Sequence, residues 1–360
     1  MKYWFTTLIL IAAATLCYGQ DSKRMAVVET STCYMRIAPD YESALETQEL
    51  MGTVVEIVGE SGYWREIVSP QPYKAWTTEK TLIEMTAEQI KEYEEAPKYM
   101  FIELYGHIYM EPSEKSQTIC DLVGGDVMRM ALRNPDTEKN DTGKREPKGA
   151  SDAVTRGKWV QVVLPSGVEG WVLKNAVQPL GERINIRKGD TSDQLVSDEK
   201  MEAIIASAEQ LLGVPYFWGG MSSKGVDCSG LVRISAILND VLLPRNASQM
   251  IFCGTPVEMN CNLIFWNEEY RTAGDGKYTR EFIEEMNGRV RNLQRGDLVF
   301  FGTPATDEKP MRVTHVGIYL GNNRIIHSSH KVRINSLIPG QKDYYENAHR
   351  LLNARRFIGR

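Results

Sequence analysis

The 360-residue chain has few cysteines and no large excess of charge of either sign. Six cysteines are too few for a fold built on disulfides. A formal net charge of −5 gives no global positive field, so nucleic acid is not an expected partner. Hydrophobic residues make up 42% and charged residues 25%, as in soluble globular proteins, which excludes extended disorder and a coiled-coil rod. At roughly 150 residues per domain, the length predicts two to three domains.

Long apolar runs are absent except at the N-terminus, where Lys2 precedes an apolar stretch over residues 3–16. The pattern predicts a signal peptide over residues 1–19, because a transmembrane helix needs about 20 apolar residues. Leu16 stands before Cys17, where a lipidation signal needs a small side chain, so a lipoprotein anchor at Cys17 is not expected. The mature chain is expected to be exported, periplasmic or extracellular, with no transmembrane segment.

The mature chain keeps five cysteines, and this odd number leaves at least one free thiol in an exported protein. Cys253 and Cys261 are close enough in the sequence for pairing to stay open, but spacing does not establish disulfide geometry. No metal site is expected, because the chain has no HExxH motif, no CxxC pair and no other cluster with ligand spacing.

The first half of the chain contains an internal repeat. Two tryptophans, and a proline followed by a glycine, recur at matching spacings: Trp64 and Trp76, Trp159 and Trp171, Pro39 and Gly52, Pro112 and Gly125. Short alternating segments broken by turn residues predict two small β-barrels at 26–85 and 99–180. A helical linker capped by Thr86 is expected at 86–98. The tryptophans are expected in the barrel cores, and the charged segment 134–157 is expected to be a solvated loop.

This pattern, with the segment GWVLKNAV, resembles the bacterial SH3-like domains that accompany cell-wall enzymes.

The second half begins with an amphipathic helix after Ser197, followed by PYFWGG (215–220) and GVDCSGLVRISAIL (225–238). The latter segment predicts a turn that leads into a helix whose first residues are Asp227, Cys228 and Ser229. The positive end of a helix dipole lowers the pKa of a thiol, and a nearby imidazolium lowers it further. Cys228 is therefore a candidate nucleophile.

Two histidines lie on neighbouring segments with strand character, VTHVGIYLG (313–321) and RIIHSS (324–329). The short turn between them predicts an antiparallel pair that brings His315 and His327 together. His330 competes with His327, but an odd offset along a strand puts the two on opposite faces. A nucleophile, a base and an orienting group together form a catalytic triad.

The segments YFWGG, DCSGLV, LPRNAS, RGDLVFF, THVGIYLG and IIHSS occur in the order seen in the NlpC family of cell-wall cysteine peptidases, which the region 197–360 resembles. The resemblance implies an α+β chain, with a papain-like NlpC-type catalytic domain preceded by two small SH3-like β-barrels. It also implies Cys228 as nucleophile, His315 as base and His327 as third member, with no cofactor. The whole chain resembles the γ-D-glutamyl-L-diamino-acid peptidases of the dipeptidyl-peptidase VI type.

In that subgroup a free N-terminal L-Ala is recognised beside the nucleophile, and the resemblance assigns this role to Tyr216, Asp227 and Ser229. A carboxylate next to the thiol pairs with an ammonium group and so requires an unblocked substrate. Asp227 has an alternative role as helix cap, and its charge raises the pKa of the thiol. Tyr216 could instead stabilise the oxyanion. Trp218 is either groove wall or core.

We therefore expect an exported, monomeric cysteine peptidase that hydrolyses the γ-D-Glu–diamino acid bond of peptidoglycan stem peptides (muropeptides) with a free N-terminal L-Ala. One alternative is a hydrolase of the same fold that acts on intact wall crosslinks or on an N-acyl lipid substrate. Another is a non-catalytic wall-binding protein. The segment 259–289 is longer than the family resemblance suggests, and it either lines the groove or decorates the surface, with decoration favoured.

Overall fold

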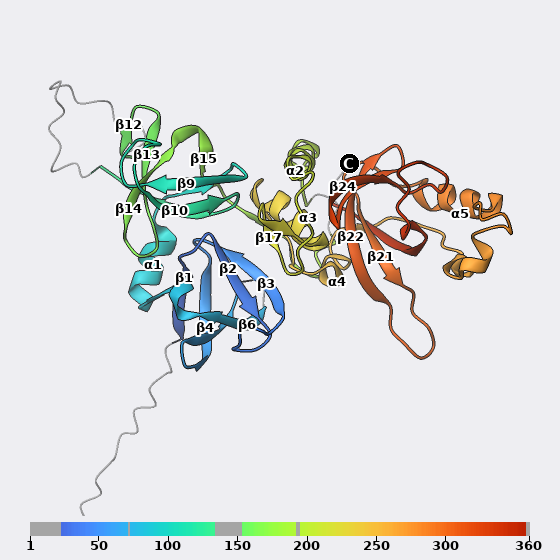
Figure 1. The fold of residues 1–360 in the computed structure, drawn as a ribbon, viewed down its shortest axis with the longest axis horizontal. Coiled ribbons are helices and arrows are strands. Elements are labelled where there is room, and N and C mark those ends of the chain that lie inside the picture. The colour runs from blue at the N-terminus through green and yellow to red at the C-terminus, as the bar shows by residue number, and fades with distance from the viewer. Residues whose placement is uncertain (1–22, 71–72, 134–152, 192–194, 358–360) are drawn as a thin grey trace, which may run out of the picture.

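The computed structural model describes residues 23–70, 73–133, 153–191 and 195–357. The expected signal peptide and most of the charged segment 134–157 lie outside these residues. Two β-sheets, in blue and in green to teal in Figure 1, precede a mixed α and β part that runs from yellow to red. None of the helices in the described part of the chain is long and apolar enough to cross a bilayer.

The first sheet has the strand order β3-β2-β6-β5-β4-β1-β7. Its elements are β1 (Arg24–Val28), β2 (Thr32–Arg36), β3 (Leu45–Leu50), β4 (Val54–Ser61), β5 (Trp64–Val68), β6 (Lys74–Thr78), the short helix η1 (Glu79–Thr81) and β7 (Leu82–Met85). Helix α1 (Ala87–Glu95) follows, where the sequence predicts a helix. Thr86 caps it in a capping box, in which the hydroxyl of Thr86 accepts from the backbone of Gln89 and the Gln89 side chain accepts from the backbone of Thr86.

The second sheet repeats the first. Its elements are β8 (Lys98–Phe101), β9 (Tyr105–Tyr109), β10 (Thr118–Val123), β11 (Val127–Met130), β12 (Thr155–Arg156), β13 (Trp159–Val163), β14 (Glu169–Leu173), η2 (Lys174–Ala176) and β15 (Val177–Pro179). The order β10-β9-β14-β13-β11-β8-β15 matches the first sheet strand for strand, with β12 added beside β13. Trp64 and Trp159 are buried at equivalent positions on β5 and β13, as expected for core residues. Trp76 and Trp171, on β6 and β14, are only half-buried, so the expectation of core positions is wrong for these two. The internal repeat is confirmed, and the two sheets are consistent with the expected SH3-like barrels.

The C-terminal part is built on a six-stranded antiparallel sheet with the order β20-β25-β21-β22-β23-β24. Its strands are β20 (Thr255–Pro256), β21 (Leu298–Thr303), β22 (Arg312–Gly321), β23 (Arg324–Ser329), β24 (Lys331–Ser336) and β25 (Leu351–Arg356). The helices are α2 (Asp198–Gln210), α3 (Cys228–Ile237), α4 (Ala247–Met250), α5 (Arg280–Val290), η3 (Leu263–Trp266), η4 (Glu268–Tyr270) and η5 (Ala348–Arg350). Two short pairs complete it: β16 (Ile184–Asn185) with β19 (Val241–Leu242), and β17 (Met221–Ser222) with β18 (Gly225–Val226).

Alternate residues of this sheet face two separate cores. Leu298 and Phe300 share a core with α2 and α3, whereas Val299 and Phe301 share one with α5. Figure 1 accordingly shows the sheet between α3 and α5.

The extra segment 259–289 contributes to the second of these cores. Phe265, Phe282 and Met286 pack there against the sheet. The fully buried Arg289, the last residue of the segment, donates to Glu285 and to the backbone carbonyls of Asn262 and His349. No described residue of the segment lines the pocket that holds Cys228. The segment therefore covers the back of the catalytic sheet, in line with the favoured reading of a decoration.

Candidate active site

Cys228 is the first residue of α3, as the sequence predicts, and Asp227 caps this helix by accepting from the backbone of Gly230 at 2.7 Å. The thiol lies at a pocket of about 330 Å³. The backbone of Val316 acts to lower the pKa of the Cys228 thiol, so the sulfur lies near β22, against which α3 packs. Because Val316 directly follows His315, the thiol lies next to the strand that carries the candidate base.

The two histidines come from neighbouring antiparallel strands, as predicted. Nε2 of His315 lies 2.8 Å from Nδ1 of His327. His327 is fully buried, whereas His330 is exposed beyond the end of β23. The backbone carbonyl of His330 accepts from the backbone of Tyr216. His327, and not His330, is therefore the histidine in contact with His315.

A residue that the sequence analysis missed fixes the protonation pattern of these rings. Nδ2 of Asn335 donates to the carbonyl of Asp343 at 2.8 Å, so its Oδ1 faces Nε2 of His327 at 3.0 Å. Nε2 of a neutral His327 must then carry the proton, and its Nδ1 accepts from Nε2–H of His315. This order leaves Nδ1 of His315 as the basic nitrogen.

Burial determines the charge state of the thiol and the imidazoles. It lowers the pKa of His315 to about 3 and that of His327 to about 4. Burial, with a further contribution from the charge of Asp227, raises the pKa of Cys228 to about 12. The expectation that the helix start lowers the pKa of this thiol is therefore wrong, because loss of solvation outweighs the dipole. The free site holds a neutral thiol and a neutral imidazole.

Asp227 is saturated with hydrogen bonds. Its two carboxylate oxygens accept from the backbone of Gly219 and Gly230, from the hydroxyl of Ser229, and from Nη1 and Nη2 of Arg245. Arg245 is buried, and its Nε donates to the Thr47 hydroxyl of the first sheet at 2.8 Å. The sequence analysis quoted Arg245 within LPRNAS but gave it no role.

The pocket brings together all four predicted substrate-binding residues: Tyr216, Trp218, Asp227 and Ser229. The side chain of Trp218 is 66% exposed, so it forms a groove wall rather than core. Burial raises the pKa of Tyr216 to about 12, with smaller contributions from Cys228 and Asp227, so its hydroxyl stays protonated and can donate.

The first sheet supplies the opposite wall of this pocket through Glu46 and Tyr73, which the sequence analysis missed. The hydroxyl of Tyr73 donates to the Glu46 carboxylate at 2.9 Å, and the Asn246 amide donates to the Tyr73 hydroxyl at 3.2 Å. Within the described residues, Glu46 forms no ion pair. The pocket therefore contains one carboxylate without a cationic partner.

Successive residues of strand β3 contact the C-terminal part and hold the first sheet against it. Beyond the Thr47–Arg245 bond, the Gln48 side chain accepts from the backbone of Met221 at 2.9 Å, and Glu49 lies 3.9 Å from Arg233. These three residues of β3 are buried. The contacts fix Glu46 relative to Cys228.

The described cysteines are all free, so Cys253 and Cys261 are not joined. Their thiols donate instead to backbone carbonyls of Arg187 and Leu351. In the ranges that the structure describes, no group of histidine, cysteine and carboxylate side chains could hold a metal ion.

Comparisons with known proteins show which family and which fold the chain resembles. Residues 213–350 match the model of the NlpC/P60 family. The chain is 25% identical over 320 residues to a gamma-D-glutamyl-L-lysine dipeptidyl-peptidase of Bacillus cereus, with 86% of this chain and 75% of that protein covered. It is 24% identical over 316 residues to dipeptidyl-peptidase 6 of Lysinibacillus sphaericus, with 87% of this chain and 91% of that protein covered.

A crystal structure of an NlpC/P60 family protein from Bacillus cereus has the same fold. It aligns with a TM-score of 0.61 at 19% identity, and the alignment covers 93% of this chain and 99% of that one. The expected α+β, NlpC-type fold is thereby confirmed. Residues 213–350 form an NlpC/P60 domain, and the chain is a cysteine peptidase.

Proposed function

We propose that this chain hydrolyses the bond between γ-D-glutamate and the diamino acid in peptidoglycan stem peptides whose N-terminal L-Ala is free. One observation carries the proposal: Cys228 and the carboxylate of Glu46 line the same pocket, next to Thr314, which precedes His315 on β22. The name of the Bacillus cereus relative, with an alignment that covers 75% of that protein, supports the same bond.

In this mechanism Cys228 is the nucleophile, His315 the general base and His327 the group that orients it. Sγ attacks the γ-carbonyl carbon while Nδ1 of His315 takes the thiol proton. The tetrahedral intermediate collapses to a thioester when the amine of the diamino acid leaves with that proton. Water then attacks the thioester, again deprotonated by His315, and releases the γ-carboxylate and the thiol.

Two hydroxyl groups and an indole position the substrate. The protonated hydroxyl of Tyr216 lines the same pocket as Cys228, and we assign it as a donor to the oxyanion. Ser229, held between Asp227 and Arg245, and the exposed ring of Trp218 line the same pocket.

Glu46 is the carboxylate that pairs directly with the substrate ammonium group. The oxygens of Asp227 already accept from Arg245 and from three further donors, so its charge is compensated before substrate arrives. Glu46, in contrast, accepts only from Tyr73 among its described contacts and lines the pocket. Because Glu46 belongs to the first sheet, this sheet sets where the substrate chain must begin, and a peptide still joined to glycan is excluded.

The experiment compares L-Ala-γ-D-Glu-L-Lys, free and N-acetylated, as substrates of the wild type and of Cys228→Ala. A parallel pair with meso-diaminopimelate in place of lysine identifies the diamino acid. Cleavage of only the free form, lost in Cys228→Ala, is expected. Cleavage of both forms would overturn the requirement for a free amine, and cleavage of neither would overturn the proposed bond.

A further inference from the structure

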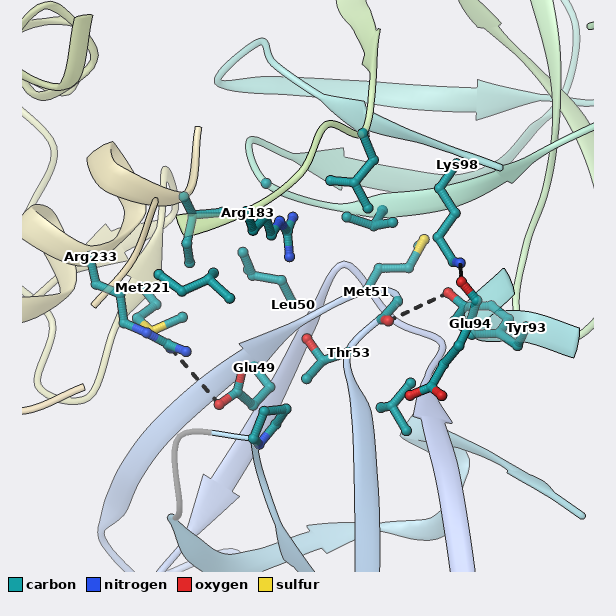
Figure 2. Close-up of a pocket in the computed structure, with 18 residues that line it drawn as sticks. Glu49, Leu50, Met51, Thr53, Tyr93, Glu94, Lys98, Arg183, Met221 and Arg233 are labelled. Carbon is teal, nitrogen blue, oxygen red and sulfur yellow. Dashed lines mark hydrogen bonds and ion pairs between the residues drawn. The ribbon is translucent and has the colours of Figure 1, made fainter. Parts of the chain in front are cut away.

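A second cavity, of about 400 Å³, lies where the three parts of the chain meet (Figure 2). Its walls come from the first sheet, from α1 and the second sheet, and from α3 with the segment that leads to it. Much of the lining is apolar: Leu50, Met51, Val127, Leu180, Met221 and Ile237. It shares no lining residue with the pocket at Cys228.

The cavity is formed by the repeat itself. Gly52 and Gly125 occupy equivalent turns of the two sheets, each with positive φ, and both line the cavity. A Cβ atom on Gly52 would lie 2.4 Å from the carbonyl oxygen of Val127, so only glycine permits this approach. The backbones are joined there, since the N–H of Val127 donates to the carbonyl of Met51 at 3.0 Å. The two glycines therefore let the two turns meet closely and form a fixed wall of the cavity.

Two arginine side chains line this apolar cavity, and their guanidinium groups have few hydrogen-bond acceptors among the described residues. The side chain of Arg233 is 5% exposed; its Nε donates to a carbonyl, its Nη1 contacts a methionine sulfur, and its Nη2 makes no hydrogen bond to a described residue. Its nearest carboxylate, Glu49, is 3.9 Å away. Among the described residues, Nε of Arg183 is buried without a hydrogen-bond partner, and its Nη2 contacts the sulfur of Met100. Figure 2 shows both guanidinium groups beside the apolar side chains.

Electrostatics point the same way. Burial lowers the pKa of Arg183 and of Arg233, and the charges of Asp240 and of Glu49 offset this only in part. An anion placed near both buried guanidinium groups stabilises their charged forms. Buried polar hydrogens without partners are costly, so a carboxylate that accepts from them is favoured.

We propose that this cavity is a binding site for a small organic anion with an apolar body, such as a carboxylate with about six carbons. Its carboxylate accepts from Arg183 and Arg233, and its alkyl chain packs on Leu50 and the neighbouring apolar residues. The volume falls within the range of small-molecule sites, about 300–1,000 Å³. The site is independent of the reaction at Cys228.

Two elements nevertheless extend from this cavity to the catalytic pocket. Helix α3 has Cys228 at its start, Arg233 in its middle and Ile237 at its end, and β3 has Glu46 near its start and Glu49 and Leu50 at its end. A ligand here would rest on both elements that hold the catalytic pocket together.

The test measures binding of hexanoate by isothermal titration calorimetry to the chain from Gln20 onward, with hexan-1-ol as the uncharged probe of equal length. We expect saturable binding of hexanoate at one site and at least tenfold weaker binding of hexan-1-ol. Arg183→Leu should weaken hexanoate binding at least tenfold. The matched control Arg187→Leu, at an exposed arginine that does not line the cavity, should leave it unchanged.

A second variant guards against loss of folding in Arg183→Leu. Thr53 is half-buried at the cavity wall, and the hydrogen bonds it forms come from its backbone, so Thr53→Trp fills the space with little other change. If Thr53→Trp keeps the circular dichroism spectrum of the wild type but no longer binds hexanoate, the proposal is supported. Equal binding of hexanoate and hexan-1-ol, or unchanged binding of hexanoate to folded Arg183→Leu or Thr53→Trp, would overturn it.

Discussion

Arg245 donates to both carboxylate oxygens of Asp227, with Nη1 3.1 Å from Oδ1 and Nη2 2.6 Å from Oδ2. Its Nε donates to the hydroxyl of Thr47. A single guanidinium thus connects the residue before the catalytic thiol to the first sheet. The pair is buried on both sides. The geometry of the catalytic helix and the docking of the first sheet therefore depend on the same side chain.

Replacing Arg245 with methionine should destabilise the chain strongly. Removing one partner of a buried ion pair leaves an uncompensated charge, at a cost of about 3–5 kcal/mol. Urea unfolding followed by circular dichroism measures the change. The matched control is Arg295→Met, which breaks an exposed pair with Glu202 and should cost under about 1 kcal/mol. Equal effects of the two substitutions would contradict the role assigned to Arg245.

The catalytic residues could be predicted because their signals are local. Cys228 stands at a helix start within one motif, and His315 and His327 lie on strands joined by a short turn. Short-range pairing of this kind follows from turn and strand patterns. The strand order of the two sheets could also be anticipated as a repeat, although its register could not.

The residues that were missed act across long distances in the sequence. Thr47, Gln48 and Glu49 have the polar character of an exposed strand, yet docking on the catalytic part buries them. Glu46 enters the site through the same docking. The error about the thiol pKa has the same origin, because a helix start is visible in the sequence whereas the burial that raises the pKa of Cys228 comes from tertiary packing.

Glu46→Gln tests the ammonium contact. The substitution keeps the size of the side chain and removes its charge, so KM for the free tripeptide should rise about tenfold or more, while kcat changes little. Steady-state kinetics measure both. Glu42→Gln, at an exposed glutamate of the same sheet that does not line the pocket, should leave KM unchanged. If Asp227→Asn stays folded and raises KM more than Glu46→Gln does, Asp227 rather than Glu46 binds the ammonium group.

The neutral state of the free site predicts the pH dependence of alkylation. Because the pKa of Cys228 is raised to about 12 and that of His315 is lowered to about 3, a thiolate is scarce between pH 6 and 9. Its fraction grows about tenfold per pH unit below the pKa of the thiol. The rate of reaction with iodoacetamide, corrected with Cys228→Ala, should therefore climb through this range without a plateau. A pre-formed thiolate–imidazolium pair would instead give a rate that is flat from pH 6 upward.

Asn335 should matter to catalysis although it does not touch substrate. Its Oδ1 keeps the proton on Nε2 of His327, which in turn keeps Nδ1 of His315 free to accept the thiol proton. Without this acceptor both rings can adopt the other tautomer, in which Nδ1 of His315 carries a proton and cannot act as a base. Asn335→Ala should thus lower kcat by about 10²-fold, at the lower end of what a positioned general base contributes, with KM nearly unchanged.

A purely structural role for Asn335 would leave a different signature. The substitution should lower kcat but leave alkylation of Cys228 unchanged, because alkylation follows the thiolate that forms by loss of the proton to solvent, whereas a loosened fold would expose the thiol and speed alkylation. Asn292→Ala, at an exposed asparagine whose amide also donates to a backbone carbonyl, should change neither rate. Unchanged kcat in folded Asn335→Ala would mean that the orientation of His327 comes from its packing against Tyr345, whose ring centroid lies 4.5 Å away.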